Sequence, residues 1–146
     1  MNTRPYGRGD REACLALFDG NVPDFFDAGD RDGFARFLDD PTATLLVAES
    51  AQGTVVACGG WYLDGDRAGL AWGVVARGFH SRGIGGALLR ERLRQIRADG
   101  RARRVDLRTT QRVQGFYERF GFIVRSSIPD GFGPGLDRVE MELVLA

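Results

Sequence analysis

One segment constrains the fold of this chain more than any other: a glycine-rich turn that follows a strand-like stretch and opens a helix. Residues 68–76 are typical of a strand, and residues 83–98 have the spacing of a helix with one side against a sheet. Between them the sequence runs His80-Ser81-Arg82-Gly83-Ile84-Gly85-Gly86-Ala87. A strand, a glycine turn and a helix start in this order gather free backbone N–H groups at one point, which predicts a phosphate or pyrophosphate site.

Two other phosphate-binding motifs fit this turn less well. A Walker loop requires Gly-Lys-Ser or Gly-Lys-Thr, and the chain contains no lysine. A dinucleotide fingerprint follows the first strand of a parallel unit, whereas here the preceding strands are expected to be antiparallel. The alternative that stays open is that the glycines only allow the helix to pack closely on the strand.

The remaining pattern predicts one α/β domain over residues 1–146. Further helices are expected at 10–18, 31–38 and 112–120, and further strands at 42–48, 54–63, 104–109, 122–127 and 138–145. Residues 129–135, rich in glycine and proline, are expected to form an irregular loop. This order of elements predicts a single mixed, mostly antiparallel sheet of about six or seven strands, flanked by helices on both faces.

Composition excludes several functional classes. Twenty basic and twenty acidic residues cancel, which argues against a nucleic-acid-binding protein. No stretch is apolar enough for a membrane span or a secretory signal, so a cytoplasmic protein without a membrane partner is expected. Cys14 and Cys58 give neither a disulfide framework nor metal-ligand spacing, and His80 is the only histidine. We therefore expect no metal, and a monomer or a homodimer.

A second segment adds information about function. It reads Gln114-Gly115-Phe116-Tyr117-Glu118-Arg119-Phe120-Gly121-Phe122. This segment and the glycine turn, at their observed spacing, resemble the GNAT superfamily of acyl-CoA N-acyltransferases over residues 42–124. The first motif of that family is Gln/Arg-x-x-Gly-x-Gly/Ala, and the second is a tyrosine-bearing helix that ends in Gly-Phe. Here His80 stands where the family usually has Gln or Arg, and Thr110 where an Asn often begins the second motif.

The resemblance implies that acetyl-CoA is the acyl donor and that its pantetheine arm enters a wedge between two strands. The strand at 68–76 would part from the strand at 104–109, with Gly73 marking a bulge. Backbone groups of Val74 and Val75 would bind pantetheine and the acyl oxygen. The full set of predicted cofactor-binding residues is Val74, Val75, His80, Ser81, Arg82, Gly83, Ile84, Gly85, Gly86, Ala87 and Thr110.

The resemblance also assigns roles in the reaction. Tyr117 is predicted to be the general acid, because a tyrosine hydroxyl stays protonated at neutral pH and can donate to the leaving thiolate. The alternative is a core aromatic residue whose hydroxyl is merely hydrogen-bonded. The general base stays open. The acidic candidates are Glu49, Asp64, Asp66 and Asp106, and a water relay is favoured over each of them.

The acceptor is expected on the side of the first two helices, where Asn21, Phe25 and Trp61 are the predicted contacts. Asn21 could equally cap its turn. The predicted activity is transfer of an acetyl group from acetyl-CoA to a primary amine of a small molecule or peptide by direct attack. The alternatives are acetylation of a protein N-terminus or lysine, and a catalytically weak acyl-CoA-binding module.

Overall fold

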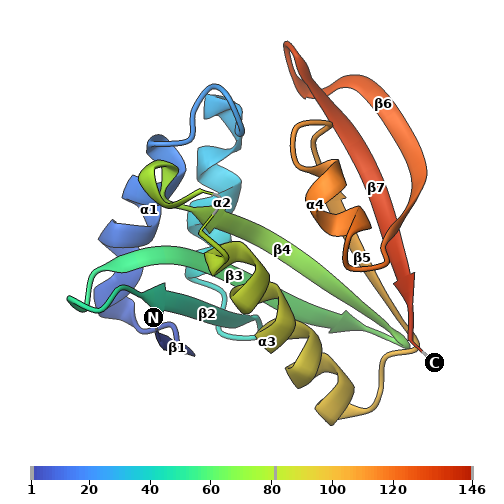
Figure 1. Cartoon of the computed structure of the whole chain (residues 1–146), viewed down its shortest axis with the longest axis horizontal. Coiled ribbons are helices and arrows are strands. Elements are labelled where there is room, and N and C mark those ends of the chain that lie inside the picture. The colour runs from blue at the N-terminus through green and yellow to red at the C-terminus, as the bar shows by residue number, and fades with distance from the viewer. Residues whose placement is uncertain (1, 81, 146) are drawn as a thin grey trace.

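Seven strands form one sheet in the order β1-β2-β3-β4-β5-β7-β6, as the computed structural model of residues 2–80 and 82–145 describes it (Figure 1). All neighbouring strands are antiparallel except β4 and β5, which are parallel. This is the mixed, mostly antiparallel sheet that the sequence predicts. The strands are β1 (Asn2–Pro5), β2 (Thr44–Glu49), β3 (Val55–Asp64), β4 (Arg67–Val75), β5 (Arg104–Thr109), β6 (Ile123–Gly133) and β7 (Leu136–Val144).

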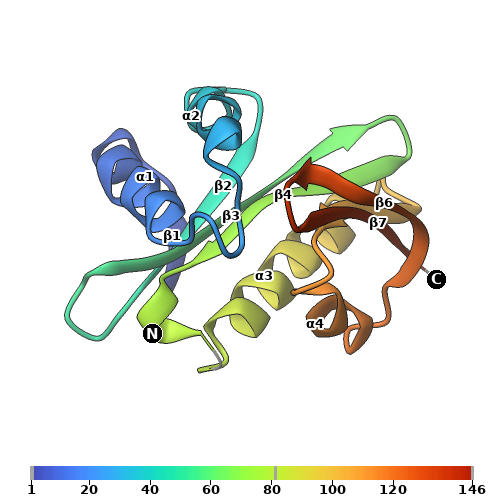
Figure 2. The same cartoon turned by 90° about the horizontal axis from the view of Figure 1, so that it is seen from above.

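Helices cover both faces of the sheet (Figure 2). Helices α1 (Arg11–Asp19) and α2 (Arg31–Leu38) lie on one face, and α3 (Ile84–Asp99) and α4 (Gln114–Glu118) lie on the other. Three short 3-10 turns, η1 (Arg8–Asp10), η2 (Ala28–Asp30) and η3 (Arg77–Phe79), lead into α1, into α2 and towards α3. None of the helices described is long and apolar enough to cross a membrane.

The hydrophobic core has one main layer on each face. On the α3 side, Leu89, Leu93 and Ile96 pack against Val105 and Leu107 of β5. This agrees with the apolar spacing expected for the long helix, since buried residues recur every three or four positions. On the other side the buried residues of α1 and α2 pack against β2 and β3. This layer includes Cys14 and Phe18 of α1, Phe34 of α2, Val47 of β2 and Cys58 of β3.

Two predictions about strands were incomplete or wrong. Strand β1 was not predicted, and it pairs with β2 at the sheet edge. Residues 129–135 were predicted to be irregular, but β6 continues through them to Gly133. The strand is interrupted rather than absent, because the pairing with β7 shifts between Ile128 and Gly133 and Asp130 has a positive φ of 54°. The carboxylate of Asp130 accepts the N–H of Gly135, which closes the turn into β7.

The feature that positions the site is the early end of pairing between β4 and β5. These strands pair only from Arg67 to Gly69, opposite Arg104 to Asp106. Beyond Gly69 they diverge, and Figure 1 shows β4 and β5 as the two arms of a V. Within residues 2–80 and 82–145, the backbone N–H and C=O groups on this edge of β4 therefore have no partner strand. This separation confirms the wedge expected from the sequence.

Candidate active site

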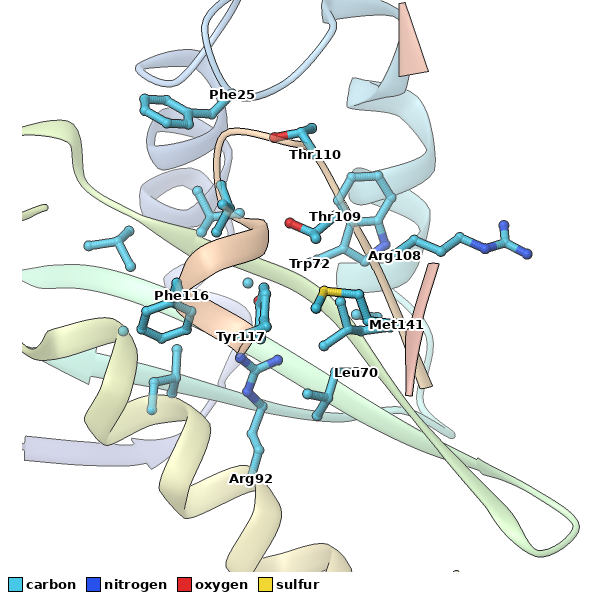
Figure 3. A pocket seen from close by; sticks show the side chains of 18 of the residues that line it. Phe25, Leu70, Trp72, Arg92, Arg108, Thr109, Thr110, Phe116, Tyr117 and Met141 are labelled. Atoms are coloured by element: carbon cyan, nitrogen blue, oxygen red, sulfur yellow. The ribbon is translucent and has the colours of Figure 1, made fainter. Parts of the chain in front are cut away.

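A cleft of about 1360 Å³ opens where β4 and β5 diverge. Its lining comes from β4 between Leu70 and Val75, from β5, from the start of α3 and from α4. Figure 3 places Tyr117 of α4, Trp72 of β4 and Thr110 beyond β5 around the same space. The cleft therefore joins the two segments that the sequence analysis singled out, although about 30 residues separate them in the chain.

A bulge shapes the β4 side of the cleft. Cys58 pairs with Val74 and Gly60 pairs with Ala71, so Trp72 and Gly73 together face one residue of β3. This confirms the bulge expected at Gly73, although the residue with the positive φ, 54°, is Trp72. Such a conformation costs a side chain about 1–2 kcal/mol. Aromatic packing holds it here: the ring of Trp72 lies 5.2 Å from that of Phe34.

The N-terminus of α3 opens at one end of the cleft. Gly83 precedes the helix with φ 78° and ψ 0°, and none of the described side chains caps it. The first hydrogen bond within the helix runs from the N–H of Ala87 to the carbonyl of Gly83, so the preceding N–H groups point out of the helix. Gly85 and Gly86 line the cleft. This geometry suits an anion, as predicted from the sequence.

His80 ties the loop before α3 to the sheet. Its Nε2 lies 2.9 Å from the carbonyl oxygen of Val75, and its ring packs edge-on against Phe25 with 5.0 Å between ring centroids. The side-chain amide of Asn21 donates to the same carbonyl and to that of Leu17. Asn21 is buried, and these bonds support the turn-capping alternative for it. The carbonyl of Val75 is thus occupied by protein partners.

Tyr117 reaches the bulge from the opposite wall. Its ring packs between Phe116 and Phe122 in edge-to-face contacts, with centroid distances of 5.0 and 5.8 Å. A Cβ placed on Gly73 would lie 3.4 Å from the Tyr117 hydroxyl oxygen. Thr110 is buried before α4, and its hydroxyl accepts the N–H of Arg112. Thr110 thus shapes the turn that presents the helix of Tyr117.

The cleft gathers most, but not all, of the predicted site residues. Trp61 is not among its described lining: it is buried under α3, and its indole N–H donates to Gln95. Its predicted contact with an acceptor has no support in this position. Ile84 is buried against β2 and β3, and neither Arg82 nor Ala87 belongs to the lining that the described residues form. Ser81 lies outside the described residues. The predicted residues that line the cleft are Asn21, Phe25, Val74, Val75, His80, Gly83, Gly85, Gly86, Thr110 and Tyr117.

The acidic candidates for the base lie in different surroundings. Glu49 pairs with Arg4 at the far edge of the sheet, and Asp64 and Asp66 flank the exposed β3–β4 turn. Asp106 lines the cleft but pairs with Arg67 at 3.0 Å. Asp30, a half-buried carboxylate in the lining, was not among the predicted candidates. Burial, and then the charge of Asp27, raise the pKa of Asp30 above its ordinary value.

Two further residues of the lining were also missed. Trp72 lies in the predicted strand at 68–76, and its side chain forms a wall of the cleft on the α1–α2 side. Arg92 of α3 is buried and still reaches the cleft. Its position four residues after Leu88 on a helix with a buried face is the signal that could have identified it. Within residues 2–80 and 82–145, no group of three or more His, Cys, Asp or Glu side chains is placed to hold a metal ion.

Comparison with known proteins agrees with this architecture. Residues 41–124 match the family model described as an acetyltransferase (GNAT) domain. No curated protein matches the chain. The ribosomal-protein-S18-alanine N-acetyltransferase of Escherichia coli superimposes with a TM-score of 0.84 at 16% identity, covering 99% of this chain and 94% of that one.

Two further solved structures contain the coenzyme. The proposed acetyltransferase yncA of Salmonella typhimurium, solved with acetyl-CoA, superimposes with a TM-score of 0.79 at 19% identity, over 100% of this chain and 94% of that one. An aminoglycoside 6'-N-acetyltransferase in complex with coenzyme A gives a TM-score of 0.79 at 14% identity, over 99% and 97% of the two chains. The likeness in fold therefore extends over nearly the whole length of each chain.

The left-handed backbone conformation at the start of α3 can be tested by comparing two glycines, one with a positive φ and one without. A Cβ at either Gly83 or Gly78 would meet none of the described atoms within 4 Å, but of these two glycines only Gly83 has a positive φ. We predict that Gly83→Ala lowers the free energy of unfolding by about 1–2 kcal/mol, whereas Gly78→Ala leaves it unchanged or slightly higher. Urea denaturation measures both. Equal effects of the two substitutions would contradict the left-handed turn.

Proposed function

Because the chain belongs to the GNAT family of acetyltransferases, and is thus an acyl-CoA-dependent N-acyltransferase that uses acetyl-CoA, we propose that it acetylates a primary amine of a small molecule or a peptide. We further propose that residues 1–146 act as one domain and that the amine attacks the thioester directly. The observation that carries the proposal is the position of the Tyr117 hydroxyl at the β4 bulge, inside the cleft.

The residues present fit the coenzyme. The N–H groups at the start of α3 and the positive end of its dipole suit a pyrophosphate, and Gly85 and Gly86 keep side chains away from it. Arg90 and Arg119 line the same end of the cleft, and neither takes part in an ion pair within the described part of the chain. They are suited to the coenzyme's phosphates. The unpaired edge of β4 beyond Gly69 offers backbone groups to the pantetheine amides.

Acetyl-CoA supplies an activated acetyl group on a thioester. The chain contributes a proton and a place for the amine. As the amine nitrogen bonds to the acetyl carbon, the carbon–sulfur bond breaks and the sulfur keeps the electron pair. Tyr117 donates its hydroxyl proton to that sulfur, and the proton released by the amine passes through water to restore the hydroxyl. Packing of the Tyr117 ring between Phe116 and Phe122 holds the hydroxyl in place.

The opposite end of the cleft suits a cationic amine. The ring of Trp72 stacks on that of Phe26 at a centroid distance of 6.4 Å, and both line the cleft together with Asp27 and Asp30. The β6–β7 hairpin approaches this corner, because a Cβ on Gly133 would lie 2.6 Å from an oxygen of Asp27. An aromatic wall beside carboxylates attracts an ammonium group. We propose that Asp30 orients the acceptor and, before the attack, takes the proton that converts its ammonium group to a neutral amine, directly or through water.

The proposed role of Tyr117 as proton donor can be tested by removing its hydroxyl. Tyr117→Phe keeps the ring and its aromatic contacts but removes the hydroxyl, so kcat should fall roughly 10²-fold or more while the Kd for acetyl-CoA stays the same. A thiol-release assay with a panel of amines measures turnover, and calorimetry measures binding. Tyr6→Phe, outside the described cleft lining, is the matched control. An unchanged kcat in Tyr117→Phe would remove this residue from the mechanism. Absence of turnover in the unmodified protein with every amine would instead favour an acyl-CoA-binding module.

The proposed contact between Asp30 and the acceptor can be tested by removing the charge of this carboxylate. Asp30→Asn should lower kcat/KM for a diamine such as cadaverine by roughly tenfold or more, since a charged hydrogen bond contributes about 1.5–3 kcal/mol. Because the pKa of Asp30 is raised, its ionised form is lost at a higher pH than usual, so unmodified enzyme should lose activity towards acid sooner than Asp30→Asn. Asp32→Asn, the same change on an exposed position of α2, is the control. Equal kcat/KM in the two variants would place the acceptor elsewhere.

A further inference from the structure

Arg92 is a buried arginine on a helix whose other arginines face solvent. Its side chain belongs to the buried face of α3, beside Leu89 and Leu93, and the residue is 3% exposed. Arg90, Arg94 and Arg97 on the same helix are exposed. A buried guanidinium is costly unless a partner compensates its charge, since arginine stays protonated in proteins. Its position therefore requires a compensating partner or a function.

No acidic partner compensates this charge within the described part of the chain. None of the ion pairs there includes Arg92. One Nη atom donates to the carbonyl of Gly60 at 3.3 Å, and the buried Nε has no hydrogen-bond partner among the described residues. Burial lowers the pKa of Arg92, and the neighbouring hydroxyl of Tyr117 acts in the opposite direction.

Glycines on two strands make room for this guanidinium. A Cβ on Gly59 would lie 2.9 Å from Cζ of Arg92, so the guanidinium occupies the space that a side chain of β3 would fill. A Cβ on Gly73 would lie 3.3 Å from an Nη atom of Arg92 and 3.4 Å from the hydroxyl oxygen of Tyr117. Both polar groups thus face the same point beside the β4 bulge. Figure 3 shows the guanidinium directed from α3 towards Tyr117.

Tyr117 and Cys58 are the titratable groups that affect the pKa of Arg92, and of these two only Tyr117 is placed to carry a negative charge during the proposed reaction. Cys58 is a fully buried free thiol, and the neighbouring thiol of Cys14 together with burial raises its pKa, so it stays neutral. Tyr117 faces the cleft and, in the function proposed above, releases its proton. Negative charge that appears on the hydroxyl oxygen of Tyr117 would meet a preformed cation in a site of low dielectric constant.

We propose that Arg92 is a positioning residue that orients the Tyr117 hydroxyl and stabilises the negative charge left on it during acetyl transfer. This inference rests on the proposed function. When the carbon–sulfur bond breaks, the proton of Tyr117 moves to the sulfur, and the phenolate remains beside the guanidinium. The proton that leaves the amine then returns through water to the phenolate. Arg92 itself gains and loses no proton.

The test is a double-mutant cycle between Arg92 and Tyr117. Arg92→Met removes the charge at similar length, Arg92→Lys keeps it, and each is made alone and with Tyr117→Phe. We expect Arg92→Met to lower kcat at least tenfold and Arg92→Lys to recover part of that loss. Combined with Tyr117→Phe, Arg92→Met should cause no further loss, because its effect passes through the hydroxyl.

Two readouts on the protein without an acceptor separate this role from a structural one. Replacing an uncompensated buried charge with an apolar side chain should leave Tm unchanged or raise it. The Kd for acetyl-CoA, from calorimetry, should change less than threefold. A lowered Tm with unchanged kcat would overturn the proposal and make Arg92 a structural residue. Equal fold-losses from Arg92→Met with and without the Tyr117 hydroxyl would overturn it while leaving the acid role of Tyr117 intact. Unchanged kcat in Tyr117→Phe alone would overturn both.

Discussion

The separation of β4 from β5 is the constraint on which the rest of the site depends. Parallel pairing holds these strands together for three residues on each side, and the bulge at Trp72 and Gly73 then turns β4 away. An unpaired strand edge inside a protein leaves N–H and C=O groups that need partners. The carbonyl of Val75 finds them in Asn21 and His80, and the remaining edge faces the cleft. A ligand with its own amide groups is the natural complement of such an edge.

The two ends of the cleft carry opposite charge, although the chain as a whole is neutral. One end combines the N-terminus of α3 with Arg90 and Arg119, and the opposite end carries Asp27 and Asp30. Between them, the guanidinium of Arg92 and the hydroxyl of Tyr117 meet beside Gly73. This order suits the proposed reaction, in which the start of α3 would bind the phosphates of the acyl donor, Tyr117 would donate the proton and the carboxylates would face a cationic amine.

Local sequence patterns predicted the elements whose formation depends on local interactions. Helix α2 and strand β5 have the predicted bounds. Asp30 directly precedes the helix, and the apolar residues Val105 and Leu107 alternate with polar residues along the strand. Strand β1 has only four residues, and its pairing with β2 could not be inferred from its own composition. The glycines and prolines of 129–135 favour a loop locally, but pairing with β7 at Ile128 and Gly133 and the hydrogen bonds of Asp130 hold this segment in an interrupted β6 that ends at Gly133.

The parts of the site that lie within one sequence motif could be predicted. The parts that depend on contacts between several helices and strands could not. The glycine turn and the helix of Tyr117 could be located from adjacent residues. The spacing of Arg92 after Leu88 indicates that it lies on the buried face of α3, but its place in the site depends on Gly59 of β3 and Gly73 of β4, which the helix pattern alone does not reveal. Trp61 was assigned to the acceptor from its place on a strand, but the alternation of side chains directs it to the α3 face. Asp30 lies in the turn before α2, and only the fold brings it to the cleft.

The central claim, that the start of α3 binds the pyrophosphate of acetyl-CoA, is tested most directly by calorimetry on two variants at Gly85. A Cβ there would lie 3.5 Å from Phe116, which is ordinary contact, so both Gly85→Asn and Gly85→Asp should fold. They differ in one negative charge at the helix start. We predict that Gly85→Asp binds acetyl-CoA at least tenfold more weakly than Gly85→Asn, because the carboxylate repels the pyrophosphate. Equal dissociation constants for the unmodified protein and both variants would contradict the account.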